Sequence, residues 1–143
     1  MFLKQFERGR TFVAKLDHQA DLLEELNKIC QHEYIKAGYI QVVGAISSLK
    51  YGFFDQDEKE YTYNTYAYDE SMEIVSCSGN VSVKDGKPFC HMHIVASDKK
   101  GKCVGGHLVA GTSIYAAEVV IQEILGEDLV RELDETTKLT LWK

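Results

Sequence analysis

The sequence predicts a single α+β domain in which helices flank a mostly antiparallel β-sheet. Most apolar stretches alternate with polar residues at the period of a strand, and turns rich in glycine or aspartate separate them. One early segment instead repeats its leucines at helical spacing. The 143 residues contain one proline and no repeat or low-complexity tract, so we expect one domain over residues 1–143.

A strand and a helix open the chain. Residues 10–16 alternate, with Phe12, Ala14 and Leu16 on one face. The following helix has Asp17 or Asp21 as its N-cap and ends by Gly38. Its apolar face consists of Leu22, Leu23, Leu26, Ile29 and Cys30.

Strands then dominate. Residues 39–54 are rich in β-branched and aromatic side chains, an acidic turn follows at 55–58, and residues 61–68 alternate tyrosines. A further strand over 73–83 leads into a turn at 84–87. Residues 113–122 suit either a helix or a strand, and the run VVI at 119–121 favours a strand.

Three histidines lie close together in a predicted hairpin. His91 and His93 are two residues apart in one strand, so their side chains point to the same face. Residues 98–102 form the turn, with Gly101 at the position that needs a positive φ. Counting back from this turn places His93 directly opposite His107 and His91 on the diagonal.

The other face of this hairpin tests that register, because a slip of one residue would exchange the two faces. A bulge at Gly105-Gly106 is the alternative that would shift it. In the predicted register the second face is apolar and suited to packing on a helix; it carries Cys90, Met92, Ile94, Ala96, Val104 and Leu108.

Three converging imidazoles predict a site for zinc or another divalent transition metal, such as Cu²⁺, Ni²⁺ or Fe²⁺. Three protein ligands leave one coordination position open, as in catalytic rather than structural zinc sites. Cys103 lies on the same face, but about 13 Å from His93 at ~3.3 Å per residue, and is not expected to be a ligand. The alternative is a set of hydrogen-bonded surface histidines that respond to pH.

Composition limits the function further. The formal charge is −6, which opposes non-specific binding to nucleic acid, although segments 1–15 and 84–102 are each net +3. No segment has the length of a membrane span and no signal peptide is visible, so we expect a cytoplasmic protein without membrane contacts. The four cysteines lack metal or redox spacing and are expected to be free and mostly buried.

Four segments together, MEIVSCSGN at 72–80, PFCHMH at 88–93, VGGHL at 104–108 and YAAEVVI at 115–121, resemble the plants-and-prokaryotes-conserved (PPC) domain family in its stand-alone prokaryotic form. The first half agrees in order and length. The resemblance implies a compact α+β domain that assembles as a homotrimer and binds metal, assigned as zinc, through His91, His93 and His107. It also implies that residues 113–122 form a strand.

The resemblance brings a DNA-binding label that comes mainly from plant members with AT-hooks. Here Arg8-Gly9-Arg10 is followed by threonine and begins a predicted strand, whereas an AT-hook needs a free segment. We therefore predict a metal-binding trimer with a DNA-binding or regulatory role. The alternatives are a metal-dependent enzyme or small-molecule-binding protein, and a trimeric scaffold that binds metal only opportunistically.

Two acids are candidates for supporting roles. Glu118 lies in an otherwise apolar strand, where an acid is costly to bury unless it is paired. Glu118 and Glu73 are the first candidates to orient a ligand histidine, to bond across a subunit interface, or to act as general base. A plain exposed edge position is the alternative for Glu118.

Overall fold

The computed structural model describes the backbone of residues 1–143 and the side chains of all but residues 67–70. Six strands form one antiparallel sheet in the order β1-β6-β2-β3-β4-β5, and two short strands form a separate hairpin. The elements are β1 (Glu7–Leu16), α1 (Leu22–His32), β2 (Gly38–Asp55), β3 (Glu60–Lys84), β4 (Lys87–Ser97), β5 (Cys103–Leu108), β6 (Ile114–Leu125), β7 (Arg131–Leu133) and β8 (Thr140–Trp142).

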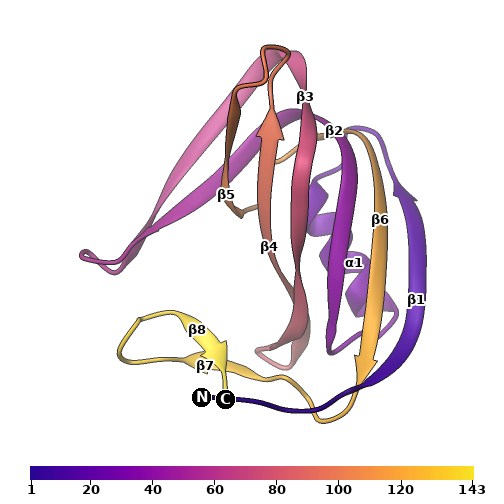
Figure 1. Ribbon diagram of the computed structural model, residues 1–143, viewed down its shortest axis with the longest axis vertical. Helices are drawn as coiled ribbons and strands as arrows, with labels where there is room; N and C mark the ends of the chain where they lie inside the picture. Colours follow the sequence, from indigo (N-terminus) through magenta and orange to yellow (C-terminus); the bar gives the residue numbers. More distant parts are fainter.

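This architecture confirms the predicted single α+β domain with an antiparallel sheet, and it confirms a strand over most of 113–122. The structure differs from the prediction in one respect: the described residues contain a single helix rather than several. Figure 1 shows α1 behind the sheet, alongside β2 and β6. No helix of the described residues is long and apolar enough to cross a membrane.

The helix begins where the sequence predicts and ends earlier. Asp21 is the N-cap, and its side chain accepts a hydrogen bond of 2.9 Å from the backbone N–H of Glu24. The helix ends at His32, well before Gly38, which instead opens β2. Its apolar stripe of Leu22, Leu26 and Cys30 is fully buried against the sheet.

β3 joins into one strand the two segments predicted at 61–68 and 73–83, and β2 extends the predicted 39–54 by one residue at each end. The end of β2 and the start of β3 extend together from the rest of the sheet as an arm, which ends at the acidic turn after Asp55 (Figure 1). The tyrosine-rich segment 61–68 lies in β3 as predicted, although the side chains of Ala67 and Tyr68 lie outside the described residues.

The sheet also closes on itself at one end. β5 pairs with β4 on one side, and on the other side Leu108 and His107 lie opposite Tyr51 and Gly52 of β2. Gly106 permits this approach, because a Cβ atom there would lie 2.5 Å from the carbonyl oxygen of Gly52. His107 is therefore fixed between two neighbouring strands.

The apolar face of the sheet and α1 form the core. The predicted hairpin face is confirmed, since Cys90, Met92, Ile94, Ala96 and Leu108 are buried, and Val104 packs at the edge of the core. Three of the four cysteines are buried and all are free, as predicted, with Cys103 exposed.

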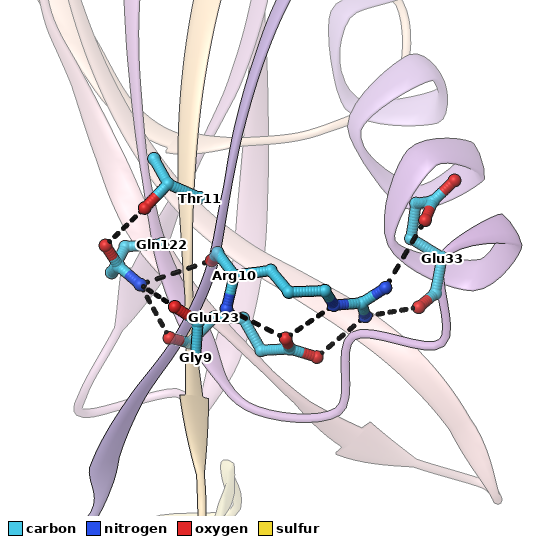
Figure 2. Close-up of polar contacts among 6 residues, drawn as sticks. All are labelled: Gly9, Arg10, Thr11, Glu33, Gln122 and Glu123. Carbon is cyan, nitrogen blue, oxygen red and sulfur yellow. Dashed lines mark hydrogen bonds and ion pairs between the residues drawn. The ribbon is translucent and has the colours of Figure 1, made fainter.

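An arginine clamp, formed by Arg10 and Glu123, joins β1 and β6 to the end of α1 (Figure 2). Arg10 on β1 donates from Nε and Nη2 to the two carboxylate oxygens of Glu123 on β6, at 2.7 and 2.8 Å. A second bond from Nη2 reaches the carbonyl oxygen of Glu33, the C-cap of α1, at 2.8 Å. Glu123 is buried, and its hydrogen bonds to Arg10 hold the pKa of its carboxyl below the ordinary value.

We expect Glu123→Gln to lower the free energy of unfolding at pH 7 by about 1–2 kcal/mol, because a neutral amide forms weaker bonds to the guanidinium. Urea denaturation measures the loss, and Glu7→Gln, an exposed position on β1, the strand that carries Arg10, is the matched control. A lowered carboxyl pKa stabilises the folded state above the unfolded value of about 4.3, so the difference should shrink as the pH falls through the folded-state pKa. Equal losses in both variants would contradict the clamp.

Candidate metal centre

Alternation along β4 positions two of the histidines. Cys90, Met92 and Ile94 point into the core, so His91 and His93 point to the opposite face of the sheet, which α1 does not cover. β5 supplies the third. His93 lies directly opposite His107, as the turn predicts, and no bulge shifts this register between β4 and β5.

The turn that sets this register has the predicted geometry. The backbone N–H of Asp98 donates to the carbonyl oxygen of Lys102 at 3.0 Å, and Gly101 has a φ of +80°. The Asp98 carboxylate accepts from the N–H groups of Lys100 and Lys102 at 2.8 and 2.9 Å. The hydrogen bonds of this turn therefore set the register that places His93 opposite His107.

The three rings converge. Their centroids are 5.3 Å apart for His91 and His93, 5.0 Å for His91 and His107, and 5.6 Å for His93 and His107. One ligand nitrogen from each ring lies within 4.8 Å of the others. Zinc–nitrogen bonds of about 2.0–2.1 Å would place three ligand atoms ~3.4 Å apart, so the rings need to close by only about an ångström.

The chemistry of these nitrogens suits a metal. Nδ1 of His107 is buried and has no hydrogen-bond partner among the described residues. Burial, helped by the positive charge of Arg131 and by the other two rings, lowers the pKa of His91 to about 4. Burial and the charges of His93 and Arg131 also lower the pKa of His107. Neutral imidazoles with free lone pairs are the form that binds metal.

A fourth protein ligand is absent from this cluster, as far as the described side chains extend. Cys103 is exposed and lies opposite Ser97, at the turn end of the hairpin, as the sequence predicts. The arrangement therefore resembles open, three-ligand sites more than closed structural ones.

The two acids named from the sequence lie elsewhere. Glu118 is exposed on β6 and lies opposite Lys15 on β1 and Val43 on β2, three strands from β4 and so about 14 Å away at ~4.8 Å per strand. β6 is an interior strand, so Glu118 is not at an edge of the sheet. Glu73 is exposed opposite Ser97, about 13 Å along the strand direction from His93.

The sequence did not reveal Arg131, which lies beside the histidines. It begins β7 and is 8% exposed. Nη2 donates to Oδ1 of Asn80 at 2.8 Å and lies 3.3 Å from Nδ1 of His91. The segment after residue 125 has no strong periodicity, and one arginine in it gives no signal of its own.

Comparison with known proteins shows the family and agrees with the fold. The model of the Plants and Prokaryotes Conserved (PCC) domain matches residues 3–125. The metal-containing protein of Archaeoglobus fulgidus is 38% identical, with a TM-score of 0.94 over 100% of this chain and 99% of its own. A plant- and prokaryote-conserved protein of Pyrococcus horikoshii is 34% identical, with a TM-score of 0.92 over 100% and 97%.

Two further comparisons reach longer or more distant proteins. The bifunctional protein GlmU of Synechococcus sp. (strain JA-3-3Ab) is 31% identical over 90% of this chain, which spans only 19% of that relative's length. A protein of Bacteroides thetaiotaomicron, named provisionally as DNA binding, shares the fold with a TM-score of 0.85 at 24% identity, over 98% of each chain.

Proposed function

Because the chain belongs to the Plants and Prokaryotes Conserved (PCC) domain family, we propose that it is a metal-binding protein of that family, in which His91, His93 and His107 hold a divalent transition metal. The observation that carries this proposal is the convergence of three imidazole nitrogens within 4.8 Å on two paired strands. The buried, unpartnered Nδ1 of His107 supports it, because buried polar atoms normally have partners.

Zinc is the first candidate among the metals, since an all-nitrogen site of three ligands suits it well. Such a metal supplies a Lewis acid with an open coordination position. A metal-dependent enzyme or a small-molecule-binding protein is therefore the alternative function. It is favoured by a cavity of about 260 Å³ that His91 and His107 line together.

We expect tag-free protein loaded with zinc to contain about one metal ion per chain by elemental mass spectrometry. His93→Ala removes one of three ligands and should abolish this binding, whereas His32→Ala, an exposed histidine at the end of α1, should not. Zinc at a hundredfold excess over its dissociation constant should stabilise the wild type by about 2.7 kcal/mol. A wild type that holds no metal after loading contradicts the proposal.

We also propose that the protein assembles as a homotrimer, as the family resemblance implies. The sheet face opposite α1 exposes a set of apolar side chains: Val13, Tyr39, Val43, Val75, Val95 and Val120. Extended apolar faces of this kind normally mark interfaces. Glu118 lies on the same face, so a bond from it across a subunit interface remains our expectation for this residue.

Sedimentation equilibrium should give three times the mass of one chain for the wild type. Val43→Lys should shift it to the monomer, because a lysine ammonium is costly to bury in an apolar interface. Val43 lies opposite Glu118, so the new lysine has an acidic neighbour within its own chain. Tyr34→Asp, an exposed position after α1, is the control and should stay trimeric. A monomeric wild type contradicts the trimer.

A DNA-binding or regulatory role is our further proposal from the family resemblance. The geometry gives it limited support, because Lys87 begins β4, Lys100 lies in the turn beyond its other end, and Arg10 is bound to Glu123 and Glu33. Few lysine and arginine side chains can therefore contact the phosphates of one DNA molecule at the same time.

We expect double-stranded DNA to retain the protein at 20 mM salt and to release it by about 150 mM. Each phosphate contact adds ~0.9 to the slope with which the logarithm of the affinity falls against the logarithm of the salt concentration. The double variant Lys100→Gln/Lys102→Gln should reduce this slope by about two contacts. Lys143→Gln, whose Nζ pairs with Glu132 at 3.3 Å, is the control. The absence of retention at low salt contradicts a DNA-binding role.

A further inference from the structure

The C-terminal hairpin builds one wall of a cavity next to the histidines. β7 and β8 pair with each other, and the segment before β7 bonds to β3, where the N–H of Val83 donates to the carbonyl oxygen of Leu129 at 2.8 Å. Figure 1 shows this hairpin below the end of β5 and beside the start of β4. The cavity of about 260 Å³ lies between them; His91, His107, Tyr61, Phe89, Lys84, Arg131, Lys138 and residues 139–141 line it.

Arg131 is the buried cation of this cavity, and all its hydrogen-bond partners are neutral. Nε donates to Oγ of Ser82 at 2.7 Å, and Nη1 donates to the carbonyl oxygen of Thr140 at 2.8 Å. Nη2 contacts Asn80 and His91, as described above. Among the described side chains, no carboxylate lies within ion-pair distance of it.

A buried charge without a counter-charge is costly, and proteins normally pair it. Burial lowers the pKa of the Arg131 guanidinium, but an arginine remains charged at neutral pH. The contrast with Arg10 is informative, because Arg10 is more exposed and yet binds two carboxylates. Arg131 thus lacks the partner that its burial calls for.

The rest of the lining increases this positive charge. Lys84 lines the same cavity, as does Lys138, whose Nζ pairs with Glu135, and no aspartate or glutamate is among the lining residues. Lys84 Nζ lies 5.1 Å from the centre of the Phe89 ring, at the same wall as Arg131, whose Cζ is 5.9 Å from that ring. A divalent metal on the histidines would add two more charges, so an anion is the ligand that this cavity can best accommodate.

Donors and apolar surface are both available to such a ligand. A guanidinium has five N–H groups, and the four contacts of Arg131 leave one N–H of Nη1 uncommitted. Phe89, Leu139 and Leu141 provide apolar walls, and Tyr61 adds a ring 5.2 Å from that of His107. The volume suits a ligand of about a dozen non-hydrogen atoms rather than a nucleotide.

We propose that this cavity is a binding site for a small organic anion, whose carboxylate or phosphoryl oxygens contact both Arg131 and the histidine site and whose apolar part lies against Phe89 and the C-terminal hairpin. The proposal rests on the proposed metal site for one of its two positive poles. Arg131 and Lys84 form the other pole. This assigns a substrate or effector class, carboxylates and phosphate monoesters, to the metal centre.

Calorimetric titration of the zinc-loaded protein in an amine-sulfonate buffer tests this proposal. Benzoate and phenyl phosphate carry the two anionic groups on the same ring, and benzamide is the neutral counterpart of benzoate. We expect at least one of the anions to bind with a dissociation constant below about 1 mM and benzamide to give no binding heat. The stronger of the two anions identifies the carboxylate or the phosphoryl class.

Variants then locate the anion. Arg131→Gln should weaken binding at least tenfold, and Lys84→Gln, which leaves the bonds of Arg131 intact, should weaken it several-fold. Lys87→Gln lies three residues away and outside this cavity, and should bind like the wild type. The fluorescence of Trp142, the single tryptophan, reports whether the hairpin stays docked, since its ring centre is 5.5 Å from Arg131 Cζ.

The outcomes separate this inference from the proposed metal function. Zinc-loaded wild type that binds neither anion up to 10 mM overturns the anion site while leaving the metal site in place. Equal affinity of the wild type and both cavity variants overturns it as well. Anion binding by a wild type that holds no zinc would contradict the metal proposal and support Arg131 and Lys84 as the anion pole.

Discussion

The alternation of side chains along β4 is the constraint on which the rest of the molecule depends. Met92 and Ile94 are completely buried against the helix layer, and each contributes about 1.5–3 kcal/mol through removal of its surface from water. A slip of one residue would expose these side chains and bury His91 and His93 in their place. Core packing thus holds the histidines on the opposite face of the sheet, in the register that the turn sets.

The two arginine clusters illustrate how the protein treats charge in two different ways. Arg10 and Glu123 neutralise each other and hold β1, β6 and the end of α1 together, so that cluster is complete within the chain. Arg131 is more deeply buried and binds only neutral groups. A buried cation that has no counter-charge among the described side chains, and that lies beside three imidazoles, is a feature expected at a binding site rather than at a structural one.

The fold itself does not fix the activity, because the same domain occurs alone in two archaeal proteins and matches about a fifth of a much longer bifunctional protein. The features that bear on function are grouped on one side of the sheet. The histidines, the cavity beneath the C-terminal hairpin and the exposed valines all lie away from α1. The helix and the core therefore occupy one face of the sheet, and the sites that we propose for binding and assembly lie on the other.

Local patterns in the sequence were sufficient to determine the histidine cluster. Two local features, the i, i+2 spacing of His91 and His93 and the turn closed by Gly101, act over fewer than twenty residues. They predict without any tertiary information that His93 faces His107, and the structure confirms it. Alternation likewise predicted the buried face of the hairpin and the first strand. Capping preference left Asp17 or Asp21 as the start of the helix, and the structure has Asp21.

Only the tertiary structure decided what surrounds that cluster. Arg131 reaches His91 from forty positions away, the pairing of β2 with β5 depends on two distant glycines, and Arg10 binds Glu123 across more than a hundred residues. The position of Glu118 also became clear only from the structure: it lies on a strand in the middle of the sheet, and its side chain is exposed. The facing of the three histidines is set by local geometry, whereas the charges around them depend on how distant segments pack.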